Sequence, residues 1–371
     1  MPIEEDTVHI PVRQRKAKNR PKESAWRQQK LPAFRPVLNA QCAFIPTLIL
    51  GFIVSGMGVY MYISAENSLE FEQEYTNCTD PQTGYSESTR KEGDPMANIQ
   101  CQFNINLAQN YTGNVRFYYG LDGFYQNTRL YMASRSEKQL YGDLFNVDDC
   151  EPLANRTDPI DGINKKIAPC GVIADSLFND TFSLSTNDGY PVPFTARGIL
   201  SDFVRKRKFK NPPRAANQSL CDAFAGTVRP PSWTRDACQL GAPLTEEEAE
   251  RESVGTGFEN IDLIVWMRTA ALPKFRKIYR ILDDEAEEYK LGLPAGNYTL
   301  RISYNYPTAA WHGKKYFVIA AATWAGGRHY FLAIAFMVVG VFLLLVSAIF
   351  FLLCLRIRYL EKRRSEQLHL Q

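Results

Sequence analysis

Residues 65–329 contain six cysteines, and their spacing limits the chemistry that they can perform: Cys78, Cys101, Cys150, Cys170, Cys221 and Cys238. No two of them form a C-x-x-C pair and the intervals are long, so a zinc or dithiol redox site is poorly supported. An even number of cysteines in one segment is typical of disulfides formed in an oxidising compartment. Six cysteines allow about fifteen connectivities. Because short loops close easily, we expect sequential pairs: Cys78–Cys101, Cys150–Cys170 and Cys221–Cys238.

The same segment carries six N-x-S/T motifs, which accept N-linked glycans in secretory compartments. Their asparagines are Asn77, Asn110, Asn155, Asn179, Asn217 and Asn297. Chance would place roughly two such motifs in a segment of this composition. The cysteines and the glycosylation motifs therefore both indicate that residues 65–329 face the lumen or the outside of the cell.

Catalytic constellations are missing from the sequence. Only His312 and His329 lie in the cysteine-rich segment, because the other two histidines, His9 and His369, are near the ends of the chain. Two histidines offer few residues from which to build a Ser-His-Asp triad or a histidine-ligated metal site. The patterns G-x-S-x-G, H-E-x-x-H and Walker A do not occur. We therefore expect no enzymatic activity, no metal and no cofactor.

Two apolar segments flank the cysteine-rich region. Residues 37–64 and 330–355 carry no charged side chain, and each exceeds the roughly 20 residues that a helix needs to cross a bilayer core. About 36 polar residues precede the first segment, and no clear A-x-A cleavage motif follows it, which favours a signal anchor over a cleaved signal peptide.

Charge predicts the orientation of the two spans. Residues 1–36 have nine basic and four acidic side chains, and residues 356–371 have five basic and two acidic ones. The middle segment has 29 basic and 34 acidic side chains. By the positive-inside rule, both tails are cytosolic and residues 65–329 form an ectodomain. The C-terminal tail is short and polar, so we expect it to be unordered.

Two further features leave their interpretation open. In the first span, Gly51, Ser55 and Gly58 form a stripe of small residues, which lets another helix approach closely. That helix is either the second span or a span of a partner. The basic run at residues 205–210 is either a solvated loop or a contact to lipid headgroups or an acidic partner.

Alternating apolar and polar residues predict a β-rich ectodomain. Tyr298, Leu300, Ile302, Tyr304 and Tyr306 share one face of a strand, and polar residues occupy the other. Shorter alternations occur at residues 103–107, 115–119 and 182–184. Because loops rich in Gly, Pro, Asn and Asp separate them, we expect half-buried antiparallel strands in a sandwich-like fold. A short helix is expected in the acidic run at residues 245–253.

Six blocks of sequence resemble the cell cycle control protein fifty, or ligand-effect modulator, family: residues 27–38, 113–131, 167–182, 208–213, 264–280 and 293–307. The segments VWMRTAALP and PCGVIADSLFNDT are long and unusual, and the blocks are spread over nearly the whole chain. Departures from the family pattern occur at Thr128, Leu130, Asp175 and Leu177, and again at residues 56–60 near the end of the first span.

The resemblance implies a non-catalytic β-subunit of a P-type phospholipid flippase, which an ATPase partner would need for exit from the endoplasmic reticulum, for stability and for lipid translocation. It implies contacts with that ATPase and with membrane phospholipids, no nucleic acid, and residence in endoplasmic reticulum, Golgi or endosomal, and plasma membranes. The implied partner-binding residues are Arg27, Gln28, Gln29, Leu31, Pro32 and Phe34 in the tail, Gly51, Ser55 and Gly58 in the first span, and Trp266 and Arg268 in the ectodomain.

Two other classes of membrane protein share this layout. A two-span ligand-gated ion channel also has cytosolic termini and a disulfide-bonded, glycosylated ectodomain. It needs a polar pore, however, and the second span offers only Ser347 and Cys354 as polar side chains. An orphan receptor or adhesion glycoprotein is the other alternative, and it would need no ATPase partner.

Overall fold

The computed structural model describes residues 24–27, 29–31, 40–87, 99–309, 311–324, 326–328 and 330–368. The chain divides into two compact units, Met1–Ser55 with Val338–Gln371, and Gly56–Met337. Both predicted spans are helical: α1 covers Ala40–Glu66 and α9 covers Tyr330–Leu368. Each helix is long and apolar enough to cross a bilayer, as the sequence predicts.

The C-terminal tail differs from its sequence-based prediction. We expected residues after the second span to be unordered, but α9 continues without interruption to Leu368. The continuation is rich in Arg, Leu, Glu and Lys and contains neither Gly nor Pro. These are good helix formers, so the helix has no local reason to end at the charged segment.

Two antiparallel sheets form most of the second unit. The larger has the strand order β1-β13-β4-β10-β8 and the smaller β2-β12-β7, and two short sheets pair β3 with β11 and join β5, β6 and β9. The strands are β1 Glu70–Glu74, β2 Ile99–Leu107, β3 Tyr111–Thr112, β4 Val115–Asp122, β5 Asn155–Thr157, β6 Asn164–Ile167, β7 Thr181–Thr186, β8 Phe194–Thr195, β9 Thr227–Val228, β10 Phe275–Leu282, β11 Gly292–Leu293, β12 Gly296–Tyr304 and β13 Lys314–Ala321.

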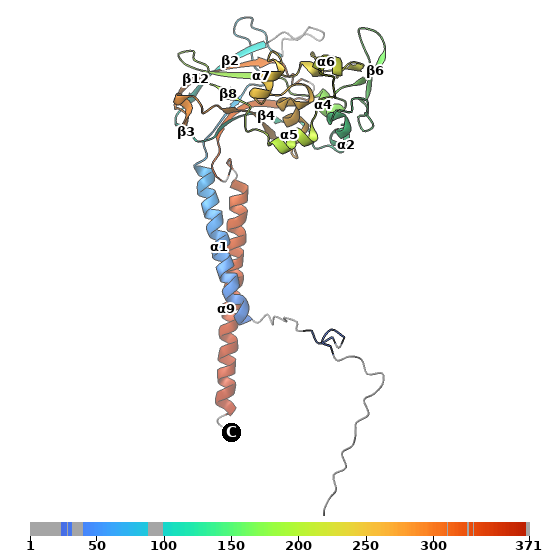
Figure 1. The fold of residues 1–371 in the computed structure, drawn as a ribbon. Coiled ribbons are helices and arrows are strands. Elements are labelled where there is room, and N and C mark those ends of the chain that lie inside the picture. Colours follow the sequence, from blue (N-terminus) through green and yellow to red (C-terminus); the bar gives the residue numbers. More distant parts are fainter. Residues whose placement is uncertain are drawn as a thin grey trace, which may run out of the picture. The chain divides into compact units, whose positions relative to one another are not determined.

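Short helices fill the connections between strands and gather mainly at one end of the sheets, with β3 at the other end (Figure 1). They are α2 Arg129–Ala133, α3 Glu137–Leu140, α4 Val172–Asp175, α5 Asp202–Lys208, α6 Leu220–Ala223, α7 Glu246–Arg251 and α8 Ile261–Met267, with single 3₁₀ turns at Ala237–Gln239, Gly257–Glu259 and Glu287–Tyr289. α7 confirms the helix predicted in the acidic run. The basic run at residues 205–210 begins inside α5 rather than in a loop.

The predicted alternation is confirmed in β12. Tyr298, Leu300, Ile302 and Tyr304 are buried, and the residues between them are more exposed. β12 is the central strand of the smaller sheet, with Leu300 opposite Phe103 on β2 and Leu184 on β7. A residue pattern of period two thus placed the inward face of this sheet correctly.

Aromatic side chains join the two sheets in one core. Phe317 on β13 of the larger sheet and Phe182 on β7 of the smaller sheet have ring centroids 5.0 Å apart. Phe117 on β4 packs on Phe317 from within the larger sheet, and both are fully buried. The inner faces of the two sheets therefore share a hydrophobic core, as expected for a sandwich-like fold.

A fully buried ion pair lies inside this core. The Lys315 ammonium on β13 is 2.7 Å from the carboxylate of Asp180, which directly precedes β7, and neither side chain is exposed. The other Asp180 oxygen accepts hydrogen bonds from the backbone N–H groups of Asn305 and Tyr306, at 2.6 and 2.7 Å. The Tyr75 hydroxyl donates to the carboxylate at 3.0 Å. Asp180 therefore connects the larger sheet to the end of the smaller sheet at which β7 begins and β12 ends.

The surroundings of Lys315 compensate for its burial. Its ammonium also donates to the Tyr306 carbonyl at 2.5 Å and lies 3.1 Å from the centroid of the Tyr304 ring. Burial lowers the pKa of Lys315 to about 8, and Asp180 opposes this effect. The charge is thus held by a carboxylate, a carbonyl and an aromatic face rather than by water.

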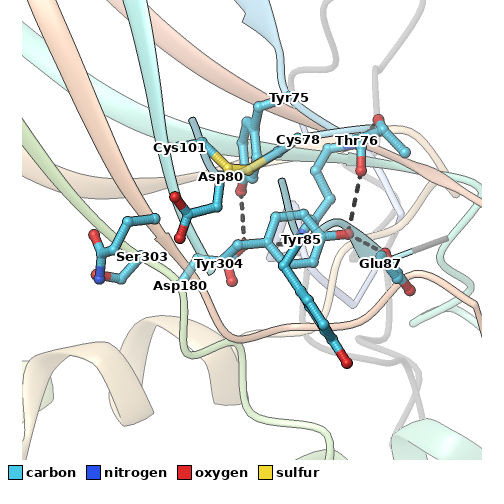
Figure 2. The surroundings of a disulfide bond; sticks show 12 residues. Tyr75, Thr76, Cys78, Asp80, Tyr85, Glu87, Cys101, Asp180, Ser303 and Tyr304 are labelled. Atoms are coloured by element: carbon cyan, nitrogen blue, oxygen red, sulfur yellow. Dashed lines mark hydrogen bonds and ion pairs between the residues drawn. A yellow bond between two sulfur atoms is a disulfide. The ribbon is translucent and has the colours of Figure 1, made fainter. Parts of the chain in front are cut away.

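Glu87 extends the network beyond the Tyr304 hydroxyl, in the surroundings of the first cysteine pair (Figure 2). Its carboxylate accepts hydrogen bonds from the Tyr304 hydroxyl and from the backbone and side chain of Thr308. Burial acts to raise the pKa of Glu87, but these hydrogen bonds, with one from Ala309, outweigh burial and lower it. Tyr304 therefore contacts Lys315 with its ring and Glu87 with its hydroxyl.

The structure brings the six ectodomain cysteines together in the expected pairs. The Cα atoms of Cys78 and Cys101 are 5.8 Å apart, those of Cys150 and Cys170 5.6 Å, and those of Cys221 and Cys238 5.0 Å. All three distances fall within the usual range of about 4.4–6.8 Å for a disulfide. The geometry is compatible with sequential pairing, which stays a prediction.

Removing the buried charge of Lys315 should destabilise the ectodomain. Lys315→Met leaves the Asp180 carboxylate buried without a cation, and we expect a loss of roughly 3–5 kcal/mol of unfolding free energy. Adding Asp180→Asn should recover part of the loss, because the amide oxygen still accepts the two backbone hydrogen bonds. Thermal unfolding of the full chain in mild detergent measures both effects.

The control for this experiment is the neighbouring residue. Lys314 is exposed and its ammonium lies 3.3 Å from the Glu74 carboxylate at the surface. Lys314→Met should cost at most about 1 kcal/mol. Equal losses for Lys314→Met and Lys315→Met would contradict a structural role for the buried pair.

Peptide mapping tests the disulfides. Digestion of the intact chain without reductant should release three linked peptide pairs, each joining sequential cysteines. Each bridge should contribute roughly 2–4 kcal/mol by restricting the unfolded chain. A linked peptide that joins Cys101 to Cys150 would rule out this connectivity.

Candidate partner interface

The sequence places Trp266 among the candidate contact residues, and the structure places it in the core. The α8 helix is capped by Asn260, whose side chain accepts hydrogen bonds from the N–H groups of Asp262 and Leu263, at 3.0 and 3.2 Å. Trp266 is fully buried, and its indole N–H donates to the Ile173 carbonyl at 2.8 Å. A direct contact between this ring and a partner is therefore incompatible with the packing, so Trp266 supports the fold instead.

A lysine from the neighbouring strand closes the end of α8. The Lys277 ammonium on β10 donates to the carbonyls of Trp266 and Arg268, each at 2.7 Å, and to that of Val265 at 3.2 Å. It also lies 4.7 Å from the centroid of the Trp266 ring. Burial, assisted by the charge of Arg268, lowers the pKa of Lys277 to about 7. Carbonyls that have no partner within the helix are satisfied here, which fixes the direction of the chain after α8.

The segment after α8 forms a surface with a second loop. The backbone N–H of Ala270 donates to the Gln126 side chain at 2.9 Å, and the Asn127 side chain donates to the Ala271 carbonyl at 3.1 Å. Residues 124–130 and 268–273 thus lie side by side, and we call them the paired-loop surface. Both segments belong to blocks that carry the family resemblance.

The paired-loop surface combines apolar and basic side chains. Tyr125, Leu130 and Leu272 are 60, 85 and 67% exposed, and Arg129 and Arg268 are exposed as well. Exposed apolar side chains beside arginine are typical of protein contact surfaces. Of the two ectodomain residues proposed from sequence, only Arg268 is on the surface. The exposed residues of the other loop were missed, because sequence alone does not show that the loops meet.

The small-residue stripe of α1 faces α9 and not an open surface. In the first unit, a Cβ added to Gly51 would meet Leu344 at 2.8 Å, and the backbone of Ser55 lies against Gly340. In the second unit, a Cβ added to Gly58 would come within 2.7 Å of the Met337 backbone. Residues of α9 already pack on the stripe, so the prediction that Gly51, Ser55 and Gly58 bind a helix of a partner is wrong.

Polar and aromatic contacts accompany this packing. In the first unit, the Ser347 hydroxyl donates to the Phe44 carbonyl at 3.2 Å, so Ser347 is bonded to the other helix. In the second unit, Trp324 stacks on Tyr60 with ring centroids 4.9 Å apart. Tryptophan and tyrosine are enriched where membrane spans meet water, and this pair joins the last part of α1 to the segment between β13 and α9.

The predicted tail residues are only partly described. Arg27, Gln29 and Leu31 are exposed, and Leu31 is 52% accessible. A short turn is closed by the Lys30 N–H donating to the Ala25 carbonyl at 2.7 Å. Gln28, Pro32 and Phe34 lie outside the described residues. The described part of the tail offers accessible side chains for a contact.

All six predicted glycosylation asparagines are exposed: Asn77, Asn110, Asn155, Asn179, Asn217 and Asn297. Two of them also accept a hydrogen bond with the side chain: Asn110 from the Ala295 N–H at 2.7 Å, and Asn297 from the Asn106 side chain at 2.5 Å. Among the described residues, no group of three or more His, Cys, Asp or Glu side chains could hold a metal ion. His329 lies outside the described residues.

Substituting two glycines of α1 tests whether the small-residue stripe packs on α9 or is only a feature of the composition of the helix. Gly58→Leu forces a side chain against the backbone of the facing helix and should cost roughly 1–3 kcal/mol. Gly56→Leu is the matched control, because nothing lies within 4 Å of an added Cβ there. Fluorescence-monitored unfolding in mild detergent should show a lower midpoint for Gly58→Leu alone. Equal midpoints would mean that the stripe does not pack on α9.

Comparison with known proteins identifies relatives across most of the chain. Residues 61–359 match the model of the LEM3 (ligand-effect modulator 3) family / CDC50 family. Cell cycle control protein 50A of Bos taurus is 38% identical over 329 residues, covering 86% of this chain and 85% of the relative. Cell cycle control protein 50B of Homo sapiens is 37% identical over 361 residues, covering 94 and 97%.

A more distant relative comes from a plant. ALA-interacting subunit 3 of Arabidopsis thaliana is 31% identical over 329 residues, covering 88% of this chain and 84% of the relative. The similarity therefore extends over both spans and the ectodomain rather than over one motif. The chain belongs to the LEM3/CDC50 family.

Proposed function

We propose that this chain is the non-catalytic subunit of a P-type phospholipid flippase and that its ATPase partner needs it to leave the endoplasmic reticulum and to move lipid. Membership of the LEM3/CDC50 family carries this proposal, together with a relative whose name describes an interacting subunit. Two spans in a membrane-protein family make the chain an integral membrane protein. A subunit that binds only the folded ATPase would stabilise it by mass action.

The proposed topology places both termini in the cytosol and residues 65–329 in the lumen or outside the cell. The positive charge of both tails supports this orientation. The exposure of all six glycosylation asparagines and the disulfide-compatible distances of three cysteine pairs support it independently. From there the chain would travel with its partner through Golgi or endosomal membranes to the plasma membrane.

We assign the ectodomain contact to the paired-loop surface. Its backbone is fixed by Lys277 and by hydrogen bonds between the loops, so exposed side chains are presented in one arrangement. A preorganised surface loses little conformational entropy on binding. Arg268 and Arg129 would then face acidic groups of the ATPase, and Tyr125 and Leu272 its apolar side chains. The tail residues Arg27, Gln28, Gln29, Leu31, Pro32 and Phe34 would contact the ATPase on the cytosolic side.

Surface substitutions test the contact without disturbing the core. Trp266→Ala would cost roughly 3–5 kcal/mol through lost packing, so it cannot separate folding from binding. Tyr125→Asp combined with Leu272→Asp changes exposed side chains only. We expect this variant to fold, and to recover roughly ten- to a hundredfold less ATPase in co-immunoprecipitation, with a matching loss of fluorescent-lipid uptake.

Two controls complete the experiment. Tyr190→Asp changes a 69% exposed tyrosine between β7 and β8 and should leave ATPase recovery unchanged. Truncation after Arg364 removes only about the last turn of α9 and should have a small effect. Normal ATPase recovery by the Tyr125/Leu272 variant would refute the assigned surface. ATP hydrolysis by the purified chain alone, or a homotrimer without a large partner, would refute the proposed function.

A further inference from the structure

A cavity of about 620 Å³ lies in the ectodomain beside Asn179. It is bounded by the end of β12, by residues 177–181 before and at the start of β7, and by the loop at residues 232–244. Small-molecule sites commonly have about 300–1,000 Å³. The cavity is therefore large enough for a ligand of one or two rings, and neither the proposed function nor the partner interface uses it.

Asn179 is both a lining residue of this cavity and the acceptor of a glycosylation motif, Asn179-Asp180-Thr181. Its side chain is exposed, whereas its neighbours on both sides are buried. A sugar attached to a residue that lines a cavity begins in that cavity or at its mouth. We propose that the cavity holds the first sugars of an N-linked glycan on Asn179.

The backbone at Asn179 is held firmly. Phe178 stacks on Tyr119 with ring centroids 4.0 Å apart, and Asp180 is fixed by the buried ion pair with Lys315. The Asn179 carbonyl also accepts a hydrogen bond from the Asn305 side chain at 3.1 Å. Because its two neighbours are anchored in the core, the backbone at the attachment point is fixed at the edge of the cavity.

The chemistry of the lining suits a carbohydrate. A sugar ring presents C–H groups that pack on aromatic faces and hydroxyls that need hydrogen-bond partners, and this cavity provides both. Trp233 is a half-buried aromatic lining residue. Tyr119 and Tyr279 also line the cavity, but one ring stacks on Phe178 and the other is covered by the Arg280 guanidinium. Asp262 has a 40% exposed side chain whose oxygens bind Arg280 at 2.7 and 3.0 Å, so it retains capacity to accept from a hydroxyl.

The loop at residues 232–244, which also lines the cavity, has polar side chains that can still form hydrogen bonds. Within the described part of the chain, the side chains of Thr234 and Arg235 form no hydrogen bond or ion pair, and both line the cavity. The loop is attached to the core through Trp233, whose indole N–H donates to the Ala174 carbonyl at 2.8 Å. A glycan in the cavity would add a second attachment between this loop and the strands.

Site-resolved deglycosylation of the native chain tests the proposal. The full chain, expressed alone in eukaryotic cells and purified in mild detergent, is treated with peptide-N-glycosidase in ¹⁸O water, and labelled asparagines are followed by mass spectrometry. A glycan held in the cavity must leave it before the enzyme can cleave it. The glycan on Asn179 should therefore be released at least about tenfold more slowly than the glycan on Asn217. After denaturation the two rates should become equal.

Filling the cavity supplies the second measurement. Thr234→Trp occupies the space proposed for the sugars and should bring release at Asn179 up to the rate at Asn217. Ser183→Trp, on an exposed position of β7 outside the lining, should leave release slow. An unoccupied Asn179, equal native rates in the unchanged chain, or slow release that survives Thr234→Trp would each overturn the proposal. The readout needs no ATPase, so it does not depend on the proposed function.

Discussion

The buried contact between Lys315 and Asp180 is the interaction on which most of the ectodomain depends. Moving two charges out of water costs several kcal/mol for each ion, and only good geometry offsets that cost. Here the Asp180 carboxylate accepts the Lys315 ammonium, two backbone N–H groups and the Tyr75 hydroxyl. These donors come from the larger sheet, from the end of β1 and from the chain after β12. One carboxylate thus fixes the position of both sheets relative to each other.

Other features of the ectodomain follow from that constraint. Asp180 is next to Asn179 in the sequence, so the same ion pair also fixes the backbone of the glycosylation motif at the edge of the cavity. Tyr306, whose carbonyl binds Lys315, has its ring 6.1 Å from that of Trp266. Trp266 in turn packs against the ammonium of Lys277, which holds the end of α8 and the start of the paired-loop surface. The internal charges therefore support the outward-facing residues that we assign to partner binding.

Much of the architecture could be predicted from local sequence patterns. The two uncharged segments, the inward face of β12 and the acidic helix α7 each depend on residues that are close in sequence. The contacts of the buried lysines depend instead on residues that are more distant in sequence. Lys315 alternates with Phe317 and Ile319, and Lys277 with Phe275 and Tyr279. We did not use these two alternations for a prediction, although they would have put both lysines on largely apolar faces. Their partners could not be read from the sequence, because Asp180 lies 135 positions from Lys315.

Similar reasoning explains the errors at the candidate interface. A stripe of Gly51, Ser55 and Gly58 fits any closely approaching helix, and only the structure shows that α9 occupies it. Trp266 lies on a helix of seven residues, too short for a periodic signal, and all but one of them are buried. The family resemblance alone made Trp266 a contact residue, whereas the exposed side chains that remain available belong to two neighbouring loops.

We propose that this chain acts as the bound subunit of a P-type ATPase, and the composition of the complex that it forms in native membranes tests this proposal. The tagged chain would be purified from eukaryotic cells in mild detergent, with mass spectrometry to identify what accompanies it and mass photometry to give the size of the complex. We predict one copy of the chain with one copy of a P-type ATPase. A chain that purifies alone or only as a homo-oligomer would contradict the account.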